Sequence, residues 1–394
     1  MTVKTNLSFG AADPGSYVLQ EALTGYTDEA YRNAKKLSGT GIVGSNPGID
    51  VSTETFIGQM RWRTPVNPNI NIANITTDSD GAVSTYGTDY LKYVKTVRNH
   101  GARKINMKQV VTQEDGLAKI ARDFGETRAQ DEHNSLMAIL KGVAISEALI
   151  GTAGDGGQSF DNASVDGATY GFYVNLGANK LVSGVGLDPA GTGNLAYQGA
   201  ARAEGFLEAF GKAYKDYEPE WAYLLVSPEV MLSLRSANLV DQDRVRDGSI
   251  DFQTIFQGKF RLIQTRATQS LSSAEIDQLN TAGGENLVNT SKTTYMVLPG
   301  AIAMETIPVP DQMEIDRNAK AYNGGGTTEI WYRWGNIYHP SGYDWVGADN
   351  KFASDLEYTY CVENGTVKEL TTVTDTNANT TGTWVRKGTT VLNL

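Results

Sequence analysis

Residues 55–111 read TFIGQMRWRTPVNPNINIANITTDSDGAVSTYGTDYLKYVKTVRNHGARKINMKQVV and lead directly into residues 112–150, TQEDGLAKIARDFGETRAQDEHNSLMAILKGVAISEALI. The first stretch has the pattern of extended strands but too few apolar side chains to form a core of its own. A two-stranded ribbon of this kind is marginal in water unless it lies on another surface. We therefore expect its partner surface to belong to a second copy of the chain, which indicates an assembly protein.

The first stretch predicts a long hairpin-like loop. A strand is expected at residues 55–62, an outgoing strand marked by Ile70, Ile72 and Ile75, a reversal from residue 78, and returning strands at residues 90–97 and 104–110. Connections between elements usually span ~2–6 residues, so one of roughly fifty is typical of a functional loop.

The second stretch predicts one long helix, with Thr112 as its N-terminal cap and a glycine-rich segment after Ile150 as its end. Its apolar side chains form two stripes, at residues 117–124 and 136–143, rotated by roughly 100° from each other. We expect the helix to serve two different surfaces, with the charged residues 128–132 facing outward. Gly116, Gly125 and Gly142 lower its helix propensity, so tertiary packing must hold it.

The rest of the chain predicts an α+β fold. Residues 1–54 have the pattern of an arm that contains one helix, and residues 327–338 alternate so that Ile330, Tyr332 and Trp334 share one face. Further strands are expected at 221–226, 260–265, 294–298, 301–307 and 356–362, helices at 203–217 and from Ser227 and Ser272, and an appended hairpin of 366–373 with 383–392.

Composition excludes several classes of protein. Apolar residues make up 40% and charged residues 20%, as in ordinary globular chains. The net charge of -11 argues against a protein whose main task is to grip nucleic acid, because phosphate neutralisation needs a basic surface. The single cysteine, Cys361, excludes an intrachain disulfide framework and fits a reducing compartment. No signal peptide or membrane span is expected.

Motifs for catalysis or cofactor binding are missing from the sequence. The three histidines, His100, His133 and His339, have no ligand-like neighbour, so no metal site is predicted. The segment GTAGDGG at residues 151–157 lacks the Lys-Ser/Thr of a phosphate-binding loop and follows a helix instead of preceding one. We predict no catalytic residues, no cofactor and no enzymatic activity.

Charge is distributed unevenly between the two opening stretches. The returning strand is basic and the first half of the helix is acidic, which is compatible with two solvated faces or with a basic ribbon that lies across the helix of a neighbouring subunit. DNA binding by the ribbon is a weaker alternative. The candidate inter-subunit residues are Lys92, Lys95, Arg98, Arg103, Lys104, Lys108, Asp123, Glu126, Asp131 and Glu132.

The order of these parts resembles the major capsid proteins of tailed bacteriophages, the Hong Kong 97-type fold. The stretches that carry this resemblance are GARKINMKQVVTQEDGLAKIARDF, WAYLLVSPEVMLSLR, MVLPGAIAMETIPVPDQMEIDRN and GGGTTEIWYRWGNIYHPSGYDWVG. The resemblance implies an N-terminal arm (1–54), an extended loop (55–111), a spine helix that starts the peripheral domain (112–160), an axial domain (161–307), peripheral return strands (308–362) and a C-terminal hairpin extension (363–394).

This resemblance implies a structural subunit that self-assembles into an icosahedral phage head around double-stranded DNA. The subunits would form hexamers and pentamers in the virion capsid after assembly in the host cytoplasm, with a portal and a decoration protein as further partners. Only residues 1–54 precede the loop, which implies a separate scaffolding protein. The Lys–Asn cross-link of some members cannot be matched here. An encapsulin-type compartment with protein cargo and a soluble enzyme with an unrecognised site stay open as alternatives.

Overall fold

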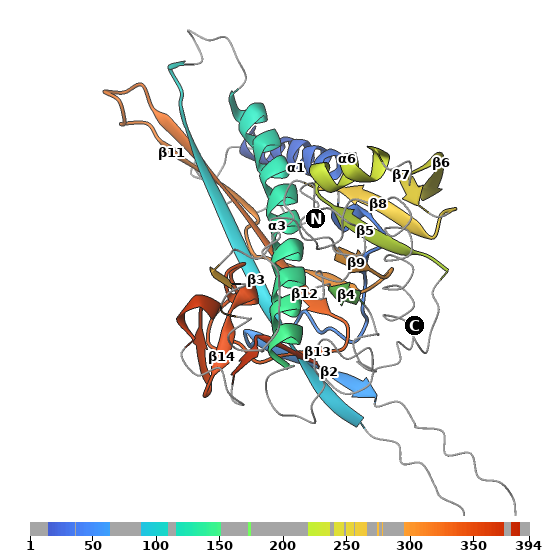
Figure 1. Cartoon of the computed structure of the whole chain (residues 1–394). Helices are drawn as coiled ribbons and strands as arrows, with labels where there is room; N and C mark the ends of the chain where they lie inside the picture. Colours follow the sequence, from blue (N-terminus) through green and yellow to red (C-terminus); the bar gives the residue numbers. More distant parts are fainter. Residues whose placement is uncertain are drawn as a thin grey trace, which may run out of the picture.

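The computed structural model describes residues 15–35, 37–63, 88–108, 116–150, 172–174, 220–236, 240–247, 250–255, 257–265, 274–275, 278, 295–373 and 380–386. The loop at 64–87, the cap at Thr112 and the helix at 203–217 lie outside these residues, as does most of the helix from Ser272. The described residues have the predicted α+β fold, with two six-stranded sheets and two smaller ones. Its longer helices are α1 (Gly15–Ala34), α3 (Gly116–Ile150) and α6 (Pro228–Ser236) (Figure 1).

The first large sheet is built around β12 (Thr327–Pro340). On one side β12 pairs with β3 (Thr88–Ile105), and on the other with β10 (Ile302–Ile307) and β11 (Met313–Asn318), all antiparallel. The predicted alternation of β12 is confirmed, because Ile330, Tyr332 and Trp334 are buried. The short strand β1 (Val43–Gly44) extends this sheet beyond β10.

Strand β3 changes partners at Val94. Its first part pairs with β2 (Ile57–Arg63), and its second part pairs with β12 from Val94 to Ile105. The sequence predicts two separate returning strands, whereas the structure has one. The reason is that β12 supplies a continuous ladder across the intervening residues, Gly101 included. Residues 88–93 of β3 therefore form a two-stranded ribbon with β2, and this ribbon extends from the sheet on the N-terminal side of Val94 (Figure 1).

The second large sheet has the strand order β4-β9-β5-β8-β7-β6. The strands predicted at 221–226, 260–265 and 294–298 are confirmed as β5 (Ala222–Val226), β8 (Phe260–Gln264) and β9 (Tyr295–Val297), and α6 begins at Pro228 as expected. β10 pairs with β12, so the two sheets divide between β9 and β10 instead of after residue 307. The other strands are β4 (Phe172–Val174), β6 (Val240–Asp247) and β7 (Ile250–Ile255).

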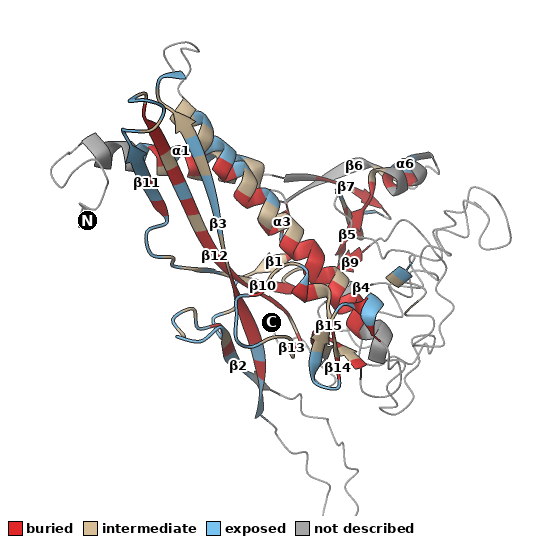
Figure 2. Ribbon diagram, turned by 90° about the vertical axis from the view of Figure 1, so that its left-hand side faces the viewer, coloured by how far each residue is buried: buried red, intermediate tan, exposed pale blue. Residues whose placement is uncertain are grey.

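Helix α3 serves two surfaces, as its two apolar stripes predict. The first stripe, with Phe124, packs in a cluster with Leu23 of α1 and Tyr332 of β12. The second stripe, with Leu140, belongs to the main core, which also contains the buried residues of β5. In Figure 2, ribbon segments coloured as buried recur along the helix between these regions. The rotation of the stripe thus lets one helix bridge two sheets.

Two glycines of α3 are points of close approach. A Cβ added at Gly125 would lie 2.3 Å from the carbonyl oxygen of Thr27, where α1 crosses the helix. A Cβ added at Gly142 would lie 1.8 Å from the carbonyl oxygen of Tyr358. Glycine lowers the helix propensity at these positions, but it allows another backbone to approach α3 closely, as predicted for a helix held by tertiary packing.

The C-terminal segments do not form the predicted hairpin. β15 (Thr366–Lys368) and β16 (Thr380–Gly382) both pair with β14 (Cys361–Glu363), while β17 (Trp384–Arg386) pairs with β13 (Tyr343–Trp345). The predicted strand at 356–362 is also wrong in its first half, which is the short 3-10 helix η2 (Glu357–Thr359). The cause is the fully buried Trp384, which packs against Trp345 and Tyr358 and draws the segment into the core.

No helix among the described residues combines the length and apolar character needed to cross a lipid bilayer.

Candidate assembly surface

A three-stranded blade projects from the body of the molecule. We define the blade as β11, residues 327–334 of β12 and residues 95–105 of β3. Its inner face packs on α1 and α3 through Ile330, Tyr332 and Trp334. Its outer face carries Trp331, whose indole lies over Gly101 of β3, and a Cβ there would come within 2.8 Å of the ring. In Figure 2 the blade is the part of the first large sheet at the upper left, away from the second sheet.

Ion pairs cross the outer face of the blade. Arg103 pairs with Glu329 of the adjacent strand at 2.6 Å, and Arg333 pairs with Glu314 at 2.7 Å. Arg103, one of the predicted contact residues, is therefore engaged within its own chain, although most of its side chain is exposed. Such exposed pairs contribute little to stability but hold the side chains in place.

Two other predicted contact residues of β3 have partners within their own chain. Lys95 is buried, and its ammonium donates hydrogen bonds to the carbonyl oxygens of Val51, at 3.3 Å, and Thr53. Burial lowers the pKa of Lys95, and the nearby Asp50 carboxylate opposes this effect. Arg98 donates to Asp355 at 2.7 Å and lies 3.9 Å from Asp131 of α3. The basic strand β3 and the acidic helix α3 are thus in contact within a single chain, through Arg98 and Asp131.

Glu132 lies inside the molecule, so the prediction that residues 128–132 face outward is wrong. The Tyr31 hydroxyl donates its single proton to the carboxylate, whose two oxygens lie 2.7 and 2.9 Å away, and Arg128 donates to it at 3.2 Å. Arg128 in turn donates to the hydroxyl of Tyr332 at 2.9 Å. Burial, followed by the negative charge of Glu132, raises the pKa of Tyr31. Helix α1 covers this face of α3, which the charge pattern alone did not reveal.

The remaining predicted contact residues lie nearer to the surface. Lys92, Lys108, Asp123 and Glu126 are exposed, and Lys104 is half-buried. Glu126 lines a polar hollow between α1 and α3 together with Arg122, whose guanidinium stacks on Tyr26. A role between subunits stays a prediction for these residues.

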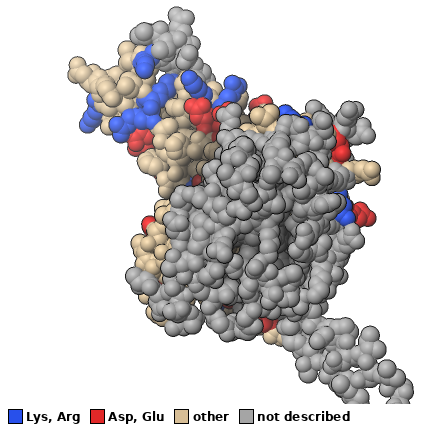
Figure 3. Space-filling view, viewed as in Figure 1, with Lys and Arg blue, Asp and Glu red and all other residues tan. Residues whose placement is uncertain are grey.

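Residues 319–326 join β11 to β12 and form the tip of the blade, which the sequence analysis missed. Tyr322 is 62% exposed, and Met107 from the end of β3 is 59% exposed beside it. Basic residues are concentrated at the same end of the molecule, where Figure 3 shows Lys and Arg gathered. The basic residues at the tip are Arg103, Lys104, Lys108, Arg317 and Lys320. The triple glycine before β12 was the available signal of a turn, but not of its exposed aromatic ring.

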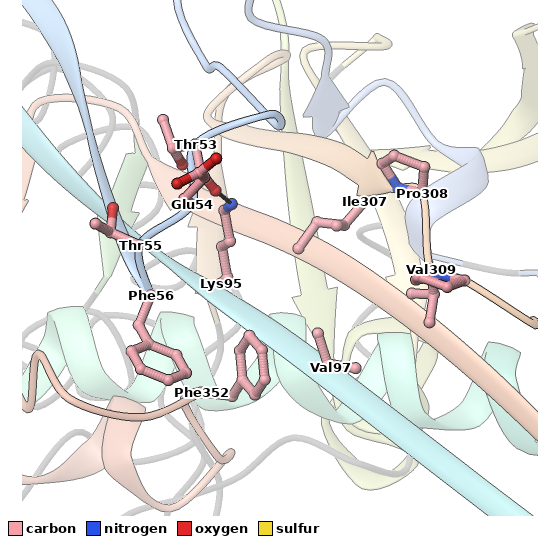
Figure 4. A pocket seen from close by; sticks show the side chains of 11 residues that line it. Thr53, Glu54, Thr55, Phe56, Lys95, Val97, Ile307, Pro308, Val309 and Phe352 are labelled. Carbon is pink, nitrogen blue, oxygen red and sulfur yellow. Dashed lines mark hydrogen bonds between the residues drawn. The ribbon is translucent and has the colours of Figure 1, made fainter.

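An apolar groove of about 290 Å³ lies at the base of the blade (Figure 4). Phe56 and Phe352 form one wall, edge to face with ring centroids 5.0 Å apart. Residues 307–310, with two prolines, form another, and Lys95 and Val97 lie along the groove on β3. Phe56 and Phe352 are 38% and 44% exposed, so this is a wet apolar surface on the isolated chain.

The described residues hold no group of three or more His, Cys, Asp or Glu side chains arranged as metal ligands. Cys361 is buried, and burial raises the pKa of its thiol to about 12, which leaves it a protonated packing residue at neutral pH. His339 is also buried, in contact with the ring of Trp384.

No protein-family model matches the chain, and no curated protein matches its sequence. Solved structures that are similar to it include the capsid of Ralstonia phage GP4, with 11% identity, a TM-score of 0.46, and 80% of this chain and 86% of that chain covered. The capsid of the cyanophage P-SCSP1u has 11% identity and a TM-score of 0.41 over 78% of this chain and 89% of that chain. The capsid of cyanophage Pam1 has 10% identity and a TM-score of 0.42 over 80% and 88%. These are phage capsid structures, the class of protein that the sequence resembles.

Proposed function

We propose that this chain is the major capsid protein of a tailed phage, a structural subunit that self-assembles into an icosahedral head around double-stranded DNA. The observation that carries the proposal is the β2–β3 ribbon. On the N-terminal side of Val94, β3 has only β2 as a strand partner among the described residues. The first residues of β3 there, Thr88, Asp89 and Tyr90, are exposed. A ribbon of two strands needs a further surface, and a second subunit supplies one.

The construction of the chain supports a role in assembly. The ribbon is anchored at its base by a small cluster that includes Met60, Leu91 and Tyr93, so its two strands leave the sheet in a fixed direction. A subunit that presents such an element to a neighbour makes a heterologous contact, which repeats around a ring or lattice. Each contact is modest, and a closed shell gains its stability from their number.

The acidic character of the chain supports a container for DNA. With a net charge of -11 the subunit repels phosphate at low salt, so the DNA it encloses can move during packaging and release. Within the proposal, hexamers and pentamers form the shell in the host cytoplasm, a separate scaffolding protein guides assembly, and portal and decoration proteins complete the virion.

Shortening the ribbon loop tests this function. Arg63 and Thr88 are directly paired, so replacing residues 64–87 by a two-residue Asn-Gly turn closes the hairpin without disturbing its register. We expect the wild-type chain, at high concentration or with its scaffolding protein, to form closed shells by negative-stain electron microscopy. The shortened variant should stay a folded monomer with a near-identical far-UV circular dichroism spectrum.

The alternatives give different results. A wild-type chain that sediments only as a discrete small oligomer under every assembly condition would contradict the proposal and favour a soluble protein. Shells from the native source that contain protein cargo and no DNA would favour an encapsulin-type compartment.

A further inference from the structure

The tip of the blade has a conformation that costs free energy. Tyr322 and Asn323 both have φ +52, in the left-handed region that bulky residues avoid, and Gly324 and Gly326 follow with positive φ. Backbone hydrogen bonds hold this turn, from Gly325 to Tyr322 at 3.0 Å and from Gly326 to Ala321 at 2.9 Å. Strain of this kind persists where the surrounding structure fixes it and is concentrated at functional sites.

The strained turn presents an apolar knob to solvent. Tyr322 and Met107 are among the most exposed large apolar side chains of the described residues, and a Cβ at Gly325 would be 3.2 Å from the Met107 side chain. An exposed aromatic ring on a backbone that is already fixed requires little further ordering on binding, which is the property of an interface anchor.

The groove at the base of the blade has the complementary shape and character. Its volume of about 290 Å³ lies at the lower limit of pockets that hold separate drug-sized molecules, which favours an inserted side chain. Glu54 lines the groove, and Asp50 and Asp311 are exposed next to its walls. The nearby cations already have partners, since Lys95 donates to backbone carbonyls and Lys351, next to Phe352, pairs with Glu357.

Charge favours a second copy of the chain as the occupant. The outer part of the blade together with the tip, residues 99–108 and 313–333, holds six basic and three acidic side chains, a net charge of +3. Since the whole chain has -11, the rest of it carries -14. A basic tip and an acidic groove rim are therefore present on the same type of chain, and their opposite potentials align two copies.

The tip cannot reach the groove of its own chain. Ile307, a groove residue, is paired with Gly335, and the tip joins β12 at Thr327, eight residues away along this rigid strand. At ~3.4 Å per residue this separates them by about 27 Å.

We propose that Tyr322 at the tip of one subunit inserts into the groove between Phe56 and Phe352 of a second copy. The contact is heterologous, because tip and groove are different surfaces of the chain, and it repeats from subunit to subunit. This inference rests on the proposed function and adds a specific contact to it. In this arrangement the basic end of the blade faces the acidic rim of the groove in the second copy.

A mixed disulfide experiment tests the contact. Tyr322→Cys and Phe352→Cys variants are prepared separately, mixed, assembled and oxidised; the natural Cys361 is buried and does not compete. We expect a cross-linked dimer on non-reducing gels from the mixture and not from either variant alone. The control replaces Tyr322→Cys by Leu232→Cys, a similarly exposed position on α6, and should give no dimer.

A second measurement avoids the question of misfolding. Tyr322→Gly relieves the positive φ and removes the ring, whereas Asn323→Gly relieves the same strain and keeps the ring. Both variants should be at least as stable as the wild type as monomers. Only Tyr322→Gly should raise the protein concentration needed for assembly, by about tenfold or more.

The outcomes separate this inference from the function on which it rests. Two results overturn the tip contact and leave the shell function intact: normal shells whose Tyr322→Cys and Phe352→Cys subunits cross-link no more than the Leu232→Cys control, or a Tyr322→Gly variant that assembles like wild type. Protection of the new thiol of Phe352→Cys from a maleimide in the unassembled chain also overturns it, because the groove is then filled by its own chain. Failure of the wild type to form shells defeats the proposed function itself.

Discussion

Replacing Gly142 by alanine should destabilise the subunit through one methyl group. The added Cβ would lie 1.8 Å from the carbonyl oxygen of Tyr358, 2.8 Å from its carbon and 3.2 Å from the Trp384 ring. The first contact involves two backbones, so no side-chain rotation relieves it. The hydroxyl of Thr383 donates to the same carbonyl at 3.0 Å and holds it in place.

The magnitude follows from two opposing effects. Overpacking in a core costs typically 1–3 kcal/mol, and a backbone contact this short belongs at or above the upper end, about 3 kcal/mol. Alanine in place of glycine inside a helix regains about 1 kcal/mol. We therefore expect the free energy of unfolding of Gly142→Ala to fall by about 2 kcal/mol or more.

Gly25→Ala is the matched control. Gly25 lies in α1, is exposed, and has no atom within 4 Å of an added Cβ. Only the helix propensity changes there, so this variant should gain about 0.5–1 kcal/mol.

Urea unfolding of the unassembled subunit measures both effects. Tryptophan fluorescence is a suitable signal, because Trp345 and Trp384 lie at this crossing with ring centroids 4.9 Å apart. A Gly142→Ala variant within about 0.5 kcal/mol of wild type, the usual range of surface changes, would refute the close approach of α3 and η2.

Three further predictions concern buried polar groups. Glu132→Gln leaves the buried Arg128 without its carboxylate and should lower the free energy of unfolding in urea by about 3–5 kcal/mol. If the Arg128→Met, Glu132→Gln double variant loses as much as the two single variants together, the two side chains are not coupled and the prediction is contradicted. Burial lowers the pKa of His339 from 6.5 to about 3, so the unfolded chain binds the proton at a higher pH than the folded chain does. The free energy of unfolding should therefore fall as the pH drops from 6.5 towards 3, by up to about 5 kcal/mol. His339→Phe should flatten this pH dependence, and an unchanged dependence would exclude His339 as its source. Lys95→Met removes a buried cation that donates to Val51 and Thr53, and should detach the segment at 51–56 without unfolding the core, which hydrogen exchange at these amides measures.

Sequence patterns located the long helix and its division into two apolar stripes, because a period of 3.6 residues and its rotation are local properties. They also identified the inward face of β12, where Ile330, Tyr332 and Trp334 alternate with more exposed neighbours. The strands β5, β8 and β9 could be predicted equally well, since short apolar runs between turns favour buried strands.

The pairing of distant segments could not be predicted in this way. Residues 366–373 and 383–392 have hairpin-like patterns, yet β15 and β17 pair with different strands, because Trp384 contributes more free energy inside the core than in an appended ribbon. The charges at 128–132 are typical of a solvated surface, and only the crossing of α1 over α3 makes Glu132 an interior group.

The sequence by itself determined the α+β character of the chain, an extended stretch at residues 55–111 with few apolar side chains, and the helix that serves two surfaces. These follow from side-chain periodicity and from a shortage of apolar residues, both of which depend only on residues that are close together in the sequence. The tertiary structure decided which charges are available for assembly, because burial depends on segments far apart in the chain. It also placed Tyr322 and the Phe56–Phe352 groove at opposite ends of one blade, where no local pattern relates them.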